Sequence, residues 1–261
     1  MIPVHFIEAW RDQANWQNAI QVEQDLVISR ALVDLYNDPH IQDTLVFRGG
    51  TALNKLFLKP PARYSEDIDF VQKRPEPIGK TLDTLRNLLK PWLGEPASKI
   101  TQRSAKLIYK YETINNTPAK LKIEINTTEH FQVLPLKIEP FIMHSEWFQG
   151  KTNIITYEID ELMATKLKAV YQRRKGRDLF DLWHVLSKNL INLDQVIDIF
   201  NQYCTHDGVS ISGEQFKQNL NLKRQNKDFQ SDMNLLLPIN AAWNFEEAFD
   251  YILEKIPQKL Q

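Results

Sequence analysis

The chain of 261 residues lacks most features of secreted, membrane-spanning or strongly basic proteins. Cys204 is its one cysteine, which excludes an intramolecular disulfide and favours a reducing cytosol. The net charge is −1, from 32 basic and 33 acidic residues, so any nucleic-acid binding must use local basic patches. The start has neither the basic nor the apolar region of a signal peptide, and no apolar run approaches the length of about 18 residues that marks a membrane helix. We therefore expect a cytoplasmic protein with no membrane contact.

Apolar residues make up 43% of the chain, enough for a substantial core. Their spacing predicts helices in residues 1–38 and from about 157 to the end. Within the latter, Cys204 follows a helical pattern, which favours a buried packing residue over the alternative of a reactive thiol. Strands, a short helix and an amphipathic helix are predicted between these regions: strand "TLVF" (44–47), helix "TALNKLF" (51–57), strand "DIDFV" (67–71), helix 79–93, and two or three strands in 98–127.

This order predicts an α+β fold in two parts. The first, residues 1–155, is a core that contains the strands and is braced by the N-terminal helices. The second, residues 156–261, is a helical C-terminal domain. The boundary is placed near 150–157 because "QGKTN" (149–153) is polar and contains glycine.

Two carboxylates stand two residues apart in the strand "DIDFV". Side chains alternate along a strand, so Asp67 and Asp69 share one face while Ile68 and Phe70 point into the core. The two negative charges repel each other, and no neighbouring basic residue is expected to reduce this repulsion. A divalent metal ion bound by both carboxylates would reduce it. An edge strand with an acidic outer face is the alternative interpretation.

Two other elements are candidates for a functional site when they are considered together with this pair. Gly49, Gly50 and Thr51 lie between a strand and a helix, where backbone N–H groups can approach an anion, although Gly-Gly is also a common turn. Glu124 lies on the polar side of "KLKIEIN" (120–126), where it is a candidate metal ligand or general base, or an ordinary exposed glutamate.

Together these residues resemble the nucleotidyltransferase superfamily that includes DNA polymerase β, and more closely the AbiEii/AbiGii toxin family. The segments "FRGGTALNKLF", "RYSEDIDF" and "ELMATKLKAVYQRRKGRDLFDLW" (161–183) carry the resemblance. It implies a polymerase-β-like core with a mixed sheet. The spacer between Gly50 and Asp67 is longer than in the wider superfamily, and the third acid is a glutamate.

The resemblance also implies roles for individual residues. Asp67, Asp69 and Glu124 would be catalytic and would hold Mg²⁺, or Mn²⁺ in its place. Gly49, Gly50, Thr51, Ser65 and Lys166 would bind the nucleotide. The family's helical motif maps onto Glu161, Lys166, Arg177, Asp178 and Asp181, of which Lys166, Asp178 and Asp181 would be catalytic.

The helical pattern can be compared with this motif. Lys166 flanks the apolar stripe of its helix and is the better candidate to reach a triphosphate, whereas Lys168 is expected to be solvated. Gly176 is typical of a helix C-cap. Asp178 could be a simple N-cap, and Asp181 is expected away from the buried stripe of the next helix.

Two basic runs, 98–122 and 165–177, could bind a polyanion or be solvated surface. The favoured function is transfer of a nucleoside monophosphate from an NTP to an acceptor hydroxyl, with the 3′ end of tRNA as the leading acceptor. The resemblance implies a toxin of a toxin–antitoxin or phage-defence (abortive infection) system with a separately encoded antitoxin. Alternatives are modification of a protein or small molecule, and a degenerate nucleotide-binding module.

Overall fold

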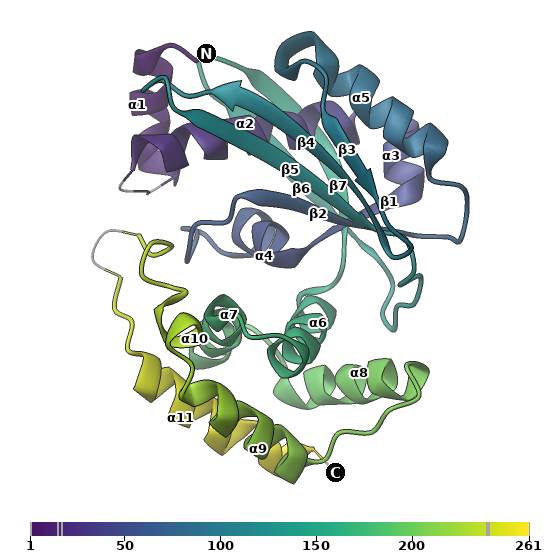
Figure 1. Ribbon diagram of the computed structural model, residues 1–261, viewed down its shortest axis with the longest axis vertical. Coiled ribbons are helices and arrows are strands. Elements are labelled where there is room, and N and C mark those ends of the chain that lie inside the picture. The colour runs from purple at the N-terminus through teal and green to yellow at the C-terminus, as the bar shows by residue number, and fades with distance from the viewer. Residues whose placement is uncertain (1, 15, 17, 239–240, 261) are drawn as a thin grey trace. The chain divides into compact units, whose positions relative to one another are not determined.

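The computed structural model describes residues 2–14, 16, 18–238 and 241–260 (Figure 1). The chain packs as two compact units. Unit 1 comprises Met1–Phe131 and Leu136–Tyr157, and unit 2 comprises Gln132–Pro135 and Glu158–Gln261.

Unit 1 is built on a seven-stranded sheet with the order β3-β4-β5-β2-β1-β7-β6. The strands are β1 (Leu45–Arg48), β2 (Asp67–Gln72), β3 (Ala97–Ile100), β4 (Ser104–Glu112), β5 (Pro118–Asn126), β6 (Lys137–His144) and β7 (Gln149–Thr156). The pairs β2–β5 and β1–β7 are parallel and the other neighbours are antiparallel. The predicted mixed sheet is therefore confirmed.

Helices cover one face of this sheet. They are α2 (Ala19–Tyr36), α3 (Pro39–Thr44) and α5 (Gly79–Leu93), and α1 (Val4–Ala14) packs on α2. Figure 1 shows α2 behind the strands, where it contacts β5, β6 and β7, and α5 contacts β4. Leu85 of α5 is fully buried, and its carbonyl accepts a hydrogen bond from Tyr109 of β4. The amphipathic helix predicted for 79–93 has these same bounds because its leucines recur on the face that meets the sheet.

Alternation along the strands separates the two faces of the sheet. Leu107, Tyr109, Leu121 and Ile123 of the central strands are buried under the helices, and the residues between them are half-buried or exposed. The short helix α4 (Gly49–Ala52) follows β1 and packs on β1 and β2, and the π-helical turn η1 (Leu53–Phe57) continues from it. One face of the sheet is thus core, and the opposite face carries the polar residues of the strands.

Several local expectations need correction. The predicted helical region 1–38 is two helices separated before Asn18, whose side chain caps α2, and positions 1, 15 and 17 lie outside the described residues. The strands β6 and β7 were not predicted. The "QGKTN" segment lies within β7, so it is not a linker. Pro140 within β6 is tolerated because β6 is an edge strand.

Unit 2 is helical in its described residues, as predicted for this part of the chain. Its helices are α6 (Ile159–Gln172), α7 (Gly176–Ser187), α8 (Leu193–His206), α9 (Gly213–Arg224), α10 (Lys227–Ser231), α11 (Phe245–Lys255) and η2 (Pro257–Lys259). Residues 239, 240 and 261 of the predicted helical region lie outside the described part. Across both units, none of the helices in the described residues combines the length and apolar character needed to cross a membrane.

Candidate functional site

Asp67 and Asp69 share one face of β2, as alternation predicts, while Ile68 and Phe70 are buried on the other face. The strand register defines their neighbours. Asp67 stands beside Lys122 of β5, and Asp69 stands between Glu124 of β5 and Arg48 of β1. The sheet therefore brings the two aspartates and Glu124 together on one face.

The expectation that no base neighbours the carboxylate pair is wrong. Lys122 Nζ lies 2.7 Å from Asp67 Oδ2 and 3.5 Å from Glu124 Oε2. Burial lowers the pKa of Lys122, but the hydrogen bond to Asp67 and the surrounding carboxylates outweigh this effect and raise it. Lys122 therefore stays charged and offsets part of the repulsion on this face.

Glu124 is held by two lysines. Lys106 Nζ lies 2.8 Å from Glu124 Oε1, whereas Lys122 is paired with Oε2. Burial raises the pKa of Glu124, but Lys106 and Lys122 outweigh burial and lower it. A carboxylate with a lowered pKa is a weak proton acceptor near neutral pH. This arrangement favours a structural or electrostatic role for Glu124 over general-base catalysis.

Arg48 and Glu129 extend the charged face beyond Asp69. Arg48 Nη1 lies 2.7 Å from Glu129 Oε2. Burial lowers the pKa of Arg48, but Tyr157, Glu129 and Asp69 outweigh burial and raise it. Sequence reasoning missed Arg48, although its position two residues before Gly50 on the strand that enters the turn was a usable signal.

The glycine turn lies directly against the carboxylate pair. Gly49 has φ +82°, and a Cβ there would be 2.6 Å from Asp69 Oδ2. A Cβ on Gly50 would be 2.3 Å from Arg63 Nη2 and 3.1 Å from Ser65 Oγ. Only glycine therefore allows the backbone to lie this close to Asp69, Arg63 and Ser65.

Thr51 fixes the turn to β2. Its hydroxyl is hydrogen-bonded to the Asp67 carbonyl and lies 2.9 Å from Ser65 Oγ, and the residue is 1% exposed. Its hydroxyl is thus engaged within the protein, whereas Ser65 is half-buried. Thr51 positions Asp67 and Ser65 rather than presenting a free donor.

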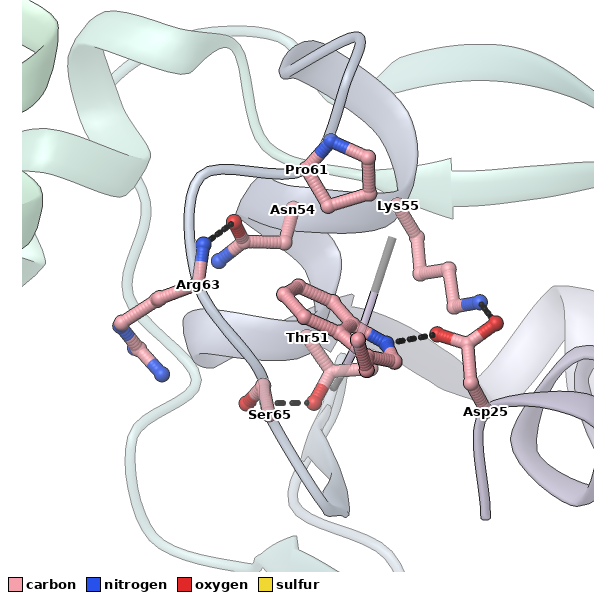
Figure 2. A pocket seen from close by; sticks show the side chains of 8 residues that line it. Asp25, Thr51, Asn54, Lys55, Pro61, Arg63 and Ser65 are labelled. Atoms are coloured by element: carbon pink, nitrogen blue, oxygen red, sulfur yellow. Dashed lines mark hydrogen bonds and ion pairs between the residues drawn. The ribbon is translucent and has the colours of Figure 1, made fainter. Parts of the chain in front are cut away.

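A small pocket lies beside this turn (Figure 2). Its space, including the part open to solvent, is about 200 Å³. Ligand pockets are generally larger, from about 300 Å³ upward, so this pocket is too small for a whole nucleotide. Figure 2 shows Thr51 facing Ser65, and Lys55 beside Asp25. Lys55 Nζ lies 2.7 Å from Asp25 Oδ1. The residues that line it are Trp16, Asp25, Thr51, Asn54, Lys55, Pro61, Arg63 and Ser65.

The metal prediction can be compared with the donor set. Among the described residues, no group of three or more His, Cys, Asp or Glu side chains is arranged to hold a metal ion. The pair Asp67 and Asp69 still offers two carboxylates on one face. Mg²⁺ is commonly bound by one or two carboxylates plus substrate phosphates and water. The donors present therefore fit a cation shared with a phosphate ligand.

In unit 2, Lys166 is buried between two aspartates. Its Nζ lies 3.1 Å from Asp178 Oδ1 and 2.8 Å from Asp181 Oδ2. Arg173 Nε also contacts Asp178 Oδ2 at 2.6 Å. Burial raises the pKa of Asp178, but Lys166 and Arg173 outweigh burial and hold it well below its usual value. These residues join α6 to α7, and their place relative to Asp67 stays a prediction.

Four expectations for this helical region are wrong. Gly176 does not cap α6 but begins α7, where a Cβ would be 2.1 Å from the Phe229 carbonyl oxygen. Asp178 is not the N-cap, because Lys175 occupies that position. Asp181 is buried rather than away from the packed side. Lys168 is not solvated, since its side chain is 11% exposed and pairs with Asp207 at 2.5 Å.

The other two motif residues make local contacts. Glu161 is fully buried and accepts hydrogen bonds from the backbone N–H groups of Val133 and Leu134 and from the Tyr203 hydroxyl. The Arg177 backbone N–H donates to Asp232. Both contacts stabilise unit 2.

Comparison with known proteins bears on this site. Residues 30–251 match the profile of a family described as "Nucleotidyl transferase AbiEii toxin, Type IV TA system". No curated protein sequence matches the chain significantly.

Solved structures resemble the fold. MenT4, a nucleotidyltransferase toxin from Mycobacterium tuberculosis H37Rv, has a TM-score of 0.70 and 18% identity, covering 97% of this chain and 88% of MenT4. JHP933 from Helicobacter pylori has a TM-score of 0.53 and 19% identity, covering 93% of this chain and 95% of JHP933.

Proposed function

Because the chain belongs to the AbiEii nucleotidyl transferase toxin family of type IV toxin–antitoxin systems, we propose that it moves a nucleoside monophosphate from an NTP to the 3′ end of tRNA. The acceptor hydroxyl oxygen bonds to the α-phosphorus as the bond to the bridging oxygen breaks, and pyrophosphate leaves. The observation that carries this proposal is the placement of Asp67 and Asp69 on one open sheet face with the Gly49 backbone against Asp69.

The two aspartates would hold the divalent cation, Mg²⁺ or Mn²⁺. When bound, that cation neutralises charge on the phosphates. The chain's own task is to keep Asp67 and Asp69 fixed on the same face, which β2 does by pairing with β1 and β5. A rigid sheet holds such a pair more accurately than a loop would.

The glycine turn would hold the triphosphate beside the pair. Without side chains, Gly49 and Gly50 let the phosphates approach the backbone N–H groups. Ser65 adds a half-buried hydroxyl at the same place. Thr51 keeps this geometry through its hydrogen bond to the Asp67 carbonyl. Binding here is by positioning and charge, the main sources of catalysis in phosphoryl transfer.

Lysines complete the electrostatics of this face. Lys122 contacts Asp67 and offsets negative charge as phosphates approach. Glu124, with its lowered pKa, holds Lys106 and Lys122 in place. We assign Glu124 a positioning role. A carboxylate of the Asp67–Asp69 pair is then the nearer acceptor for the proton of the attacking hydroxyl.

Lys166 has a different environment from the one its motif suggests. To reach a triphosphate it would have to leave both Asp178 and Asp181. Its contact with the nucleotide stays a prediction, as do catalytic roles for Asp178 and Asp181. The geometry favours a role in fixing α6 against α7.

The family places the enzyme in a toxin–antitoxin system, which implies an antitoxin partner. We propose that this antitoxin is a separately encoded protein and that the enzyme acts in the cytoplasm in phage defence. MenT4, similar in fold, is itself described as a nucleotidyltransferase toxin.

The proposal is tested by incubating the protein with each of the four α-labelled NTPs, Mg²⁺ and either total tRNA or total cell protein. We expect label at tRNA 3′ ends, and a loss of about a hundredfold or more for Asp67→Asn. The matched control is Asp83→Asn, an exposed aspartate on α5. Label in protein alone would reject the tRNA acceptor, and equal transfer by Asp67→Asn would reject the site.

A further inference from the structure

The sheet face that carries Asp67 and Asp69 also carries a row of lysines. Strand register puts Lys122 beside Asp67, Lys106 beside Glu124, and Lys99 of the edge strand β3 beside Lys106. Lys110 and Lys120 lie further along β4 and β5 on the same face. We call this set the lysine face: Lys99, Lys106, Lys110, Lys120 and Lys122.

Like charges stand directly opposite each other on the lysine face. Lys99 pairs with Lys106 across β3 and β4, and Lys110 pairs with Lys120 across β4 and β5. Like charges in directly opposite positions destabilise a sheet. Neither pair serves the core, since Lys99, Lys110 and Lys120 are exposed. Lys106 is already paired with Glu124, so the pair without a compensating carboxylate is Lys110 with Lys120, whose repulsion a bound anion would relieve.

The carboxylates that β4 and β5 place on this face are Glu112 and Glu124, two against the five lysines. Glu124 pairs with Lys106 and Asp67 pairs with Lys122. Among the residues that the structure describes, no carboxylate forms an ion pair with Lys99, Lys110 or Lys120. Positive charge therefore accumulates on the β4 and β5 side of the aspartate pair, despite a net charge of −1 for the chain.

The chemistry of the face indicates what kind of anion fits. A nucleic-acid strand is recognised through its phosphates by lysine and arginine, and through its bases by stacking on aromatic side chains. The outward positions of β3, β4 and β5 have no aromatic residue, because Tyr109 and Tyr111 both belong to the opposite set of alternating residues. This face therefore suits a phosphate backbone rather than bases.

From these observations we propose that the phosphodiester backbone of the acceptor strand lies across the lysine face, with its end at Asp67 and Asp69. The proposal rests on the proposed function, in which an acceptor hydroxyl must reach the aspartate pair. It adds that the acceptor is held by charge over β4 and β5. Affinity is then strongly salt-dependent and nearly independent of base sequence near the end of the strand.

The test compares Lys110→Gln/Lys120→Gln with Lys80→Gln/Lys90→Gln. The control pair lies on α5, which covers the opposite face of the sheet, and removes the same charge. Binding is measured by fluorescence anisotropy with single-stranded RNA and DNA of about 20 nucleotides, longer than the site of one single-strand binding fold. Titrations at several salt concentrations give the slope of log K against log salt.

If two phosphate contacts are lost, the slope becomes shallower by about 1.4, and binding at about 0.1 M salt weakens about 25-fold. The control pair should match the wild type. Comparison of the affinities for RNA and for DNA shows whether the 2′-hydroxyl of the strand contributes to binding. Equal binding by both variants, or equal losses in both, would overturn the proposal. Tighter binding of polyglutamate than of either nucleic acid would instead assign the face to an acidic protein and reject it.

Failure of the proposed function gives a different result. Binding requires no transfer, so Asp67→Asn protein is titrated with the same strands. Retained binding without transfer supports both conclusions. If Asp67→Asn transfers nucleotides at the normal rate, the proposed function is rejected. The binding data on Lys110→Gln/Lys120→Gln would still show whether the lysine face binds nucleic acid.

Discussion

The contact between Gly49 and Asp69 gives the sharpest prediction. In Gly49→Ala, the new methyl group would lie 2.6 Å from Asp69 Oδ2, and the residue would keep φ +82°. Alanine in a left-handed conformation costs about 1–2 kcal/mol. The Asp69 carboxylate must also move, since a flexible side chain yields more easily than the strand. We expect both a loss of stability and a displaced carboxylate.

Gly94→Ala separates these two effects. Gly94 has φ +74°, but a Cβ there meets nothing within 4 Å. Gly94 has ψ −161°, a conformation that is essentially restricted to glycine, so both variants should lose about 1–3 kcal/mol of unfolding free energy from backbone strain. Only Gly49→Ala should also lose nucleotide transfer. A displacement of about 1 Å in a catalytic group can cost about a hundredfold in rate.

Unfolding free energies come from chemical denaturation, and transfer rates come from labelled NTP and tRNA at a temperature where both variants are folded. The reasoning fails if Gly49→Ala keeps the transfer rate of Gly94→Ala. It also fails if the two variants lose transfer equally, because the defect would then follow stability rather than the position of Asp69.

Three other predictions follow from the ion pairs. Lys166→Met leaves Asp178 and Asp181 buried without their lysine and should lower the free energy of unfolding by about 3–5 kcal/mol in denaturant titrations. A loss below about 1 kcal/mol would contradict the buried pairing. The folded-state pKa of Asp178 is held below its ordinary value of 3.8, so its contribution to the free energy of unfolding is present above pH 3.8 and is lost as the pH falls below that value. In Asp178→Asn, the free energy of unfolding should therefore depend less on pH below 3.8. The same pH dependence in the variant and the unchanged protein would refute this. Glu124→Gln should keep at least about tenfold more transfer activity than Asp67→Asn, since Glu124 positions lysines. Equal losses in the two variants would show that Glu124 is catalytic.

Local sequence pattern predicts the faces of the strands well. Alternation alone assigns Asp67 and Asp69 to one side and Ile68 and Phe70 to the other, because burial of the apolar residues fixes the phase of the strand. It does not give the register between strands. The contact of Asp67 with Lys122 depends on parallel pairing of β2 with β5, and nothing local in either segment specifies that pairing.

The missed elements have similar causes. The β6 and β7 hairpin contains Pro140 and Gly150, which favour loops when read locally but are accommodated at the edge of this sheet. The local sequence around Gly176 is typical of a helix C-cap. The actual reason for this glycine is the close approach of the Phe229 carbonyl, from a helix more than fifty positions away. Long-range contacts of this kind leave no mark in the neighbouring sequence.

The burial of Lys166 shows the limit of motif-based assignment. Its helix face was predicted, but the partners of its ammonium group were not, since Asp178 and Asp181 lie on the next helix. Sequence order gives the residues of a motif, whereas their charges pair only once α6 and α7 are packed.

The central claim is that Asp67 and Asp69 together hold a divalent cation beside a bound nucleotide. It is tested most directly by electron paramagnetic resonance of Mn²⁺ titrated into the protein with a non-hydrolysable NTP. Asp67→Asn/Asp69→Asn should leave that Mn²⁺ free in solution, whereas the Asp83→Asn control should bind it as the unchanged protein does. Equal Mn²⁺ binding by the double variant and the control would contradict the account.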